Sequence, residues 1–179
     1  MDESLYDREA VQPMVAELNA VGVRSLATVE DVDVTLSKSS GTVLAVVNSV
    51  CGCAAGNARP GITRALQHSL IPDDSVTVFA GVDRSATERA REFMTGIAPS
   101  SPAIALFKDG KLVHMLERKH IERMSEAMVA ESLQQAFDQS CSRAGPSVSP
   151  EIYATVQHAK QCGSTIPMNH PGSAPTQPS

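Results

Sequence analysis

The sequence predicts an α/β fold in which a mixed sheet is flanked by helices, and three patterns support this prediction. Thr42–Val47 is an unbroken run of β-branched and apolar residues, typical of a strand that is covered on both faces. Ser75–Val82 is a second strand-like run, and a charged segment with helical periodicity follows it. Asp109-Gly110 stands between two further apolar runs, which is a strong hairpin signal. Strand–helix passages followed by a hairpin and a closing helix are typical of a mixed α/β sheet.

The remaining elements are expected from helical spacing and from stop signals such as Gly and Pro. Two extra helices precede the first strand, and they end before Gly22 and Gly41. The expected helices are Tyr6–Ala20, a second from Thr28, a third that follows Cys51-Gly52-Cys53 and ends at Ile71-Pro72, Arg84–Thr95 and Ile121–Gln139. The hairpin strands are expected at Ala103–Phe107 and Leu112–Leu116.

The composition changes after Cys141, so we divide the chain into a main domain, residues 1–141, and a C-terminal extension, residues 142–179. Ser149-Pro150-Glu151 combines a capping Ser with Pro at the first helical position, which predicts a helix start. This helix is expected to reach about Gln161 and to stop at Gly163. From Ser164 onwards the chain is rich in Pro, Ser, Gly and Thr, and we expect it to be disordered.

Composition excludes several classes of protein. The chain has 179 residues, 42% of them apolar, so it has enough apolar surface for a core without structural disulfides. A formal net charge of −5 disfavours nucleic acid and anionic membranes as partners. No stretch approaches the ~20 apolar residues of a membrane span, and the acidic N-terminus does not resemble a signal peptide. We therefore expect a cytoplasmic protein, in which paired cysteines are redox-active, redox-sensing or metal-binding.

The main candidate site is Cys51-Gly52-Cys53, which follows the first strand through the short loop Asn48-Ser49-Val50. At the start of a helix, unpaired N–H groups and the helix dipole favour the reactive thiolate. Residues two apart in a strand have Cα atoms roughly 6.5 Å apart, near the limit for a disulfide, so we expect Gly52 to provide a bend. We expect Cys51 to attack first and Cys53 to resolve the mixed disulfide.

Two prolines accompany the dithiol. Pro60 lies inside the expected third helix, where it should kink the axis because it lacks an N–H group. Ser101-Pro102 immediately precedes the Ala103 strand. Thiol–disulfide enzymes of the thioredoxin class have a cis-proline at this place, facing the dithiol, and we therefore predict a cis Ser101-Pro102 bond.

The sixteen residues Val46–Gly61 resemble the signature of the bacilliredoxin family, which are thioredoxin-fold proteins with a CGC site. The resemblance extends over roughly Tyr6–Cys141, and the chain departs from it by its long extension, which adds Cys162. It implies removal of bacillithiol, a low-molecular-weight thiol, from S-thiolated proteins. On this pattern Cys51 takes the bacillithiol, and Cys53 or a second bacillithiol then releases it. Bacillithiol is a co-substrate, and no bound cofactor is needed.

Other interpretations remain open at this stage. Asn57 and Arg59 are candidates for binding an anionic small thiol, or they lie on a helix surface. A rival function is soft-metal binding by Cys51 and Cys53, with Cys141 or Cys162 completing the ligand set. His158 and Cys162 also have a spacing that suits a metal on a helix, although our leading prediction assigns no metal. A general disulfide isomerase and a redox-sensing module, whose tail recruits partners, are further alternatives.

Overall fold

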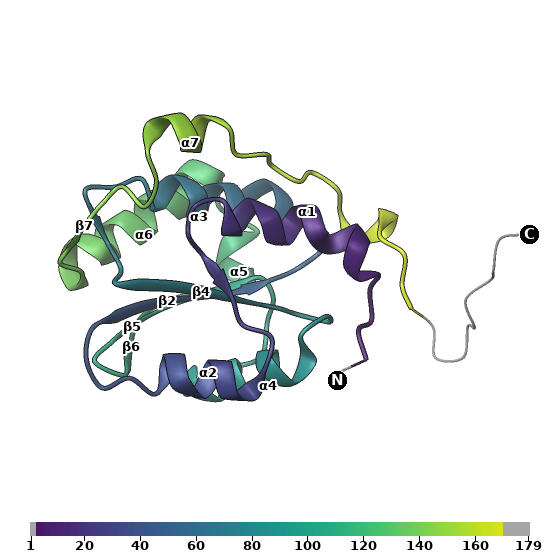
Figure 1. The fold of residues 1–179 in the computed structure, drawn as a ribbon, viewed down its shortest axis with the longest axis horizontal. Helices are drawn as coiled ribbons and strands as arrows, with labels where there is room; N and C mark the ends of the chain where they lie inside the picture. The colour runs from purple at the N-terminus through teal and green to yellow at the C-terminus, as the bar shows by residue number, and fades with distance from the viewer. Residues whose placement is uncertain (1–2, 170–179) are drawn as a thin grey trace, which may run out of the picture.

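A five-stranded mixed sheet lies between two layers of helices in the computed structural model, which describes residues 3–169 (Figure 1). The strand order is β1-β4-β2-β5-β6. At the centre, β2 (Thr42–Asn48) pairs in parallel with β4 (Asp74–Phe79) and antiparallel with β5 (Ala103–Lys108). The edge strands are β1 (Arg24–Ser25) and β6 (Lys111–Leu116). The predicted α/β class with a mixed sheet is confirmed.

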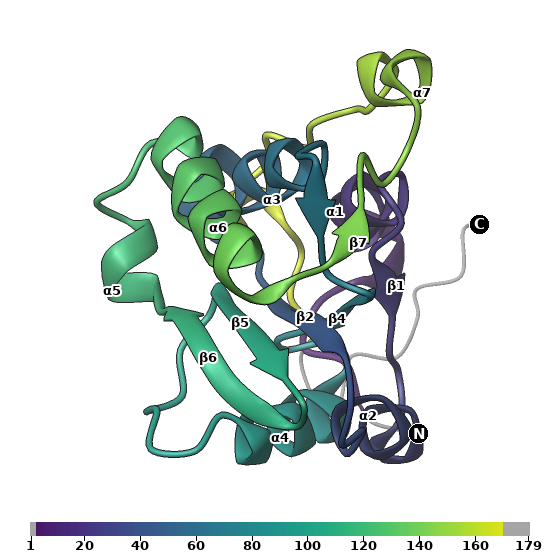
Figure 2. The same ribbon diagram turned by 90° about the vertical axis from the view of Figure 1, so that its left-hand side faces the viewer.

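The two faces of the sheet pack against different helices. On one face lie α2 (Val29–Leu36) and α4 (Arg84–Phe93), and on the other lie α1 (Arg8–Asn19), α3 (Arg59–Ala65) and α6 (Glu126–Ser140) (Figure 1). Helices α3 and α6 lie side by side (Figure 2).

All seven residues of β2 are buried, because alternate side chains enter the two cores. Leu44 and Val46 pack with Phe137 of α6, whereas Val43, Ala45 and Val47 join the core beneath α2 and α4. The double coverage that the unbroken apolar run predicted is therefore present.

Local signals explain several element boundaries. Thr28 and Asp31 form a capping box at the start of α2. The hairpin turn places both Asp109 and Gly110 at positive φ, as the favoured two-residue turn requires. The predicted last helix begins later than expected, because Ser125 caps α6 and a separate short helix, α5 (Arg118–Ile121), precedes it. Among residues 3–169, no helix is long and apolar enough to cross a membrane.

The third helix is shorter than predicted. It ends at Ala65, and Leu70–Ile71 instead form β3, which pairs with β7 (Arg143–Ala144). The partner of β3 lies in the extension and is therefore distant in sequence. The periodicity of nearby residues cannot predict a contact of this kind.

The extension is more ordered than expected where the structure describes it. Its helix α7 (Pro150–Ala154) is capped by Ser149 as predicted, but it ends well before Gln161. Ile166, in the segment predicted to be disordered, is only 5% exposed, and Met168 forms a β-bridge with Tyr6. The prediction is therefore wrong for residues 164–169. Its remaining part, residues 170–179, lies outside the described residues.

Candidate active site

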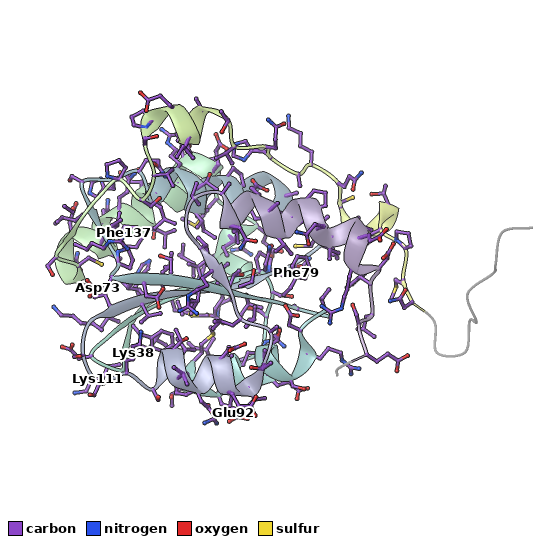
Figure 3. The ribbon with its side chains drawn as sticks, in the orientation of Figure 1. Lys38, Asp73, Phe79, Glu92, Lys111 and Phe137 are labelled. Atoms are coloured by element: carbon purple, nitrogen blue, oxygen red, sulfur yellow. The ribbon has the colours of Figure 1, made fainter. Side chains whose placement is uncertain are left out.

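The dithiol follows the carboxyl end of β2. Asn48, the last residue of β2, pairs with Phe79 of β4. Phe79 therefore marks the end of the sheet that carries the dithiol, whereas Lys111 marks the opposite end (Figure 3). Ala54 and Ala55 donate their backbone N–H groups to the carbonyl of Cys51, so the cysteines stand at the first turn of a helix. The predicted strand–loop–helix context is confirmed.

The two thiols are close and electrostatically unequal. Their Sγ atoms lie 2.9 Å apart, and both cysteines are free and partly exposed. Burial raises the pKa of Cys51, but hydrogen bonds from the Cys53 thiol, the Ser49 hydroxyl and the Ala54 N–H, together with the charge of Arg118, lower that pKa overall. Burial and the neighbouring Cys51 raise the pKa of Cys53 to about 11. Cys51 is therefore the more acidic of the two thiols, whereas Cys53 keeps its proton at neutral pH, which agrees with the roles expected from their order.

Gly52 does not provide the bend that was expected. Its backbone lies in the first helical turn and has no positive φ, so the bend between the cysteines does not require glycine. A Cβ atom at this position would meet no atom within 4 Å. The space beside Gly52 is therefore open, and a larger side chain would fit there.

A widened helical turn follows the dithiol. Ala54–Ala58 form a π-helix, in which the N–H of Arg59 donates to the carbonyl of Ala54 five residues back. Pro60 comes next, and it has no N–H group to donate while its ring would crowd the carbonyl of Gly56 in a regular α-helix. The predicted disturbance at Pro60 thus takes the form of a π-turn rather than a bend of the α-helix.

The loop before the cysteines is held by buried side chains. The Asn48 side chain accepts from the N–H of Ser49 at 2.8 Å and donates to the carbonyl of Met14. The Ser49 hydroxyl accepts from the N–H of Cys51 at 3.2 Å. Both residues are buried, and both support the loop as expected from the sequence.

Arg59 is not on the surface. It is 1% exposed, and its Nε donates to Glu17 Oε2 at 2.9 Å. One Nη donates to Asn48 and to the carbonyl of Ser49, and the other donates to the carbonyl of Ala159. Because these internal partners hold its guanidinium, Arg59 supports the dithiol loop from the interior of the protein. It does not face an incoming thiol.

Asn57 and Arg118 are linked through α5. The Asn57 side chain donates to the carbonyl of Ile121 at 2.9 Å, which holds α5 against the π-helix. Arg118, the first residue of α5, interacts electrostatically with both thiols and donates to the carbonyl of Ser101. Sequence reasoning missed Arg118, which lies 65 positions or more from either cysteine. Its position next to the basic residue Lys119, after the hairpin, was the only available signal.

The predicted cis peptide bond at Ser101-Pro102 is confirmed, and Pro102 is buried. Its neighbour Ala103 pairs with Val47. Pro102 therefore immediately precedes β5 and lies beside Asn48, the last residue of the neighbouring strand β2, which leads to the dithiol.

The remaining cysteines, Cys141 and Cys162, lie in different parts of the structure. Cys141 is buried and lies near Thr42, at the opposite end of β2, and burial raises its pKa. Cys162 lies in the extension, next to Gly163, where an added Cβ atom would lie 3.1 Å from Val50. His158 pairs with Glu17. Within residues 3–169, no group of three or more His, Cys, Asp or Glu side chains is arranged to hold a metal ion.

Comparison with known proteins agrees with this geometry. A family model described as disulphide isomerase matches residues 6–141. The bacilliredoxin of Cytophaga hutchinsonii is 50% identical over 135 residues, which are 75% of this chain and 99% of that protein. The bacilliredoxin of Koribacter versatilis is 47% identical over 137 residues, 76% and 94% of the two chains. A Staphylococcus aureus bacilliredoxin is 48% identical over 141 residues, 79% and 97% of the two chains. The chain, a thiol–disulfide oxidoreductase, therefore belongs to the bacilliredoxin family.

Proposed function

We propose that this protein removes bacillithiol from S-bacillithiolated proteins in the cytoplasm, with Cys51 as the nucleophile. The observation that supports this most directly is the inequality of the two thiols, whose Sγ atoms lie 2.9 Å apart. One thiol, Cys51, has a lowered pKa and forms the thiolate more readily, and the other, Cys53, retains its proton close enough for a second exchange. The names of the similar proteins support the same chemistry.

The first exchange transfers the small thiol. The Cys51 thiolate attacks the bacillithiol sulfur of the mixed disulfide, so a Cys51–bacillithiol disulfide forms and the protein–bacillithiol bond breaks. The repaired protein leaves as a thiolate and takes a proton from water. Arg118 stabilises the Cys51 thiolate before the attack, because its charge lies near both thiols.

The second exchange clears the enzyme. Cys53 loses its proton to water and attacks Cys51 Sγ, so that the Cys51–bacillithiol bond breaks and a Cys51–Cys53 disulfide forms. Bacillithiol leaves as a thiolate and takes a proton from water. Two further thiols, from bacillithiol or a dithiol reductase, reduce this disulfide and are themselves oxidised. In an alternative second step, free bacillithiol attacks the adduct on Cys51 and leaves as its own disulfide. The chemistry needs no bound cofactor.

Mass spectrometry of a bacillithiolated protein tests this proposal. Wild type should release bacillithiol, Cys51→Ala should release none, and Cys53→Ala should accumulate a bacillithiol adduct on Cys51. Cys141→Ala, which changes a thiol at the opposite end of β2, is the matched control and should behave like wild type.

Two results would contradict the proposal. An adduct on Cys53 in the Cys51→Ala variant would reverse the two roles. A wild-type protein that shows no turnover and carries stoichiometric metal would support the metal-binding alternative. Isomerase activity is measured separately with a scrambled disulfide substrate. A protein that is active in this assay but releases no bacillithiol would be a disulfide isomerase, and its substrates would be protein disulfides.

A further inference from the structure

The C-terminal extension returns to the dithiol and packs beside it. After α7 it runs along α1 and α3, and Figure 1 shows this segment crossing above both helices. Glu17 of α1 holds it there, accepting from the N–H of Ala159 at 3.3 Å and pairing with His158 Nδ1 at 2.6 Å. This segment lies outside residues 6–141, the part of the chain that the family model matches.

The same buried arginine binds the extension and the dithiol loop. The Arg59 guanidinium donates to the carbonyl of Ala159 at 3.0 Å and to the carbonyl of Ser49 at 2.8 Å. Its ion pair with Glu17 is almost completely excluded from water. Because one rigid group joins both segments, residues 158–160 have a defined position next to the dithiol.

A cavity of about 440 Å³ lies between the extension and the dithiol helix, by which we mean the helical segment Gly52–Ala65 that follows Cys51. Its volume is in the range of small-molecule sites, about 300–1,000 Å³. It opens beside the dithiol, because Gly52 is part of its wall. The lining residues are Gly52, Ala55, Gly56 and Pro60 from the dithiol helix, Glu126 from α6, and His158 and Lys160 from the extension.

The charges of this cavity are available to a ligand. Its dithiol-helix wall has no charged side chain, whereas Glu126 and Lys160 bring opposite charges from α6 and from the extension. Within residues 3–169, neither Glu126 nor Lys160 forms an ion pair. A small ligand with one cationic and one anionic group would satisfy both.

We propose that this cavity binds the small-thiol part of the mixed disulfide, and that the small thiol carries both an amino group and a carboxylate. Glu126 binds the ammonium group and Lys160 binds the carboxylate, while the sulfur reaches Cys51 past Gly52. This inference rests on the proposed function, and it makes the extension part of the substrate site. Lys160, which has no counterpart in the family match, determines specificity together with Glu126.

The test varies the small thiol and keeps the peptide constant. One peptide is prepared as its mixed disulfide with cysteine, with bacillithiol and with 2-mercaptoethanol, which has neither charged group. Lys160→Ala and Glu126→Gln should raise KM for the cysteine and bacillithiol disulfides roughly two- to fivefold, the range of an exposed ion pair. Neither variant should change KM for the 2-mercaptoethanol disulfide. Lys160→Arg should retain wild-type KM.

Lys111→Ala is the matched control, because it removes an exposed lysine at the opposite end of the sheet (Figure 3). An equal rise in KM for all three disulfides would mean that the cavity holds the peptide, and it would overturn the inference. Unchanged KM in both pocket variants would also overturn it. Failure of the proposed function is distinguishable, since wild type itself would then reduce none of the three substrates.

Discussion

The Arg59 guanidinium forms an ion pair with Glu17 at 2.9 Å, and the two side chains are only 1% and 0% exposed. Each also binds a further segment: Arg59 binds the dithiol loop, and Glu17 binds the extension. The pair therefore joins α1, the dithiol loop and the extension at one point.

Glu17→Ala should lower the free energy of unfolding by about 3–5 kcal/mol, because it leaves Arg59 as an uncompensated buried charge. Urea denaturation measures this change. Asp33→Ala is the matched control, since it removes the partner of Arg89 at the surface and should cost less than about 1 kcal/mol. Equal costs for the two variants would show that the buried pair does not support the fold.

Removal of the Cys53 thiol should raise the pKa of Cys51. The Cys53 hydrogen bond favours the Cys51 thiolate, so without it a proton is lost from Cys51 only at higher pH. The rate of Cys51 alkylation by iodoacetamide, followed against pH, should therefore have a higher midpoint in Cys53→Ala than in wild type.

Two controls accompany this titration. Cys53→Ser retains a donor and should keep a midpoint nearer to that of wild type. In wild type, Cys53 itself should be alkylated only in alkaline solution, because its pKa is about 11. Alkylation of Cys53 ahead of Cys51 near neutral pH would contradict the assignment.

Arg118→Gln should also raise the pKa of Cys51, since it removes a positive charge that stabilises the thiolate. The neighbouring variant Lys119→Gln makes the same change of charge and should have a smaller effect. Arg118→Lys keeps the positive charge, so the pH midpoint of Cys51 alkylation should stay near that of wild type. Because Arg118 is about half exposed, 1 M salt should reduce the difference between wild type and Arg118→Gln. A difference that does not respond to salt would indicate a structural cause.

Gly61→Ala should destabilise the protein by about 1–3 kcal/mol, the usual cost of overpacking. A Cβ atom at Gly61 would lie 2.7 Å from Val129, where α3 and α6 are in contact. Gly56→Ala is the matched control, because a Cβ atom there would meet nothing within 4 Å. Thermal unfolding of both variants gives the comparison, and similar midpoints would show that α3 and α6 can move apart without cost.

Local patterns carried much of the correct prediction. The run Thr42–Val47 predicted a doubly covered strand, because burial on both faces needs apolar residues at every position. The Asp109-Gly110 turn predicted the hairpin, because few other residues adopt its dihedral angles. Each of these signals lies within a few residues of the structure that it determines.

The predictions that were wrong concern features that depend on residues far apart in the sequence. The pairing of β3 with β7, the ordered segment that includes Ile166 and the burial of Arg59 all depend on contacts between distant segments. Ser164 onwards has the composition of a disordered chain, yet residues 166–169 pack against the N-terminal segment. Composition indicates whether a segment can fold by itself. It does not indicate whether the segment can pack against the surface of a folded domain.

The sequence by itself determined the dithiol, its place at the end of a strand and the helical turn that follows, because all three are set by neighbouring residues. Only the tertiary structure decided which charges surround the two sulfur atoms. Arg118 approaches from α5, and Lys160 enters the adjoining cavity from the extension, which Arg59 and Glu17 hold in place. Electrostatic interactions depend on distance in space, and the fold alone sets those distances.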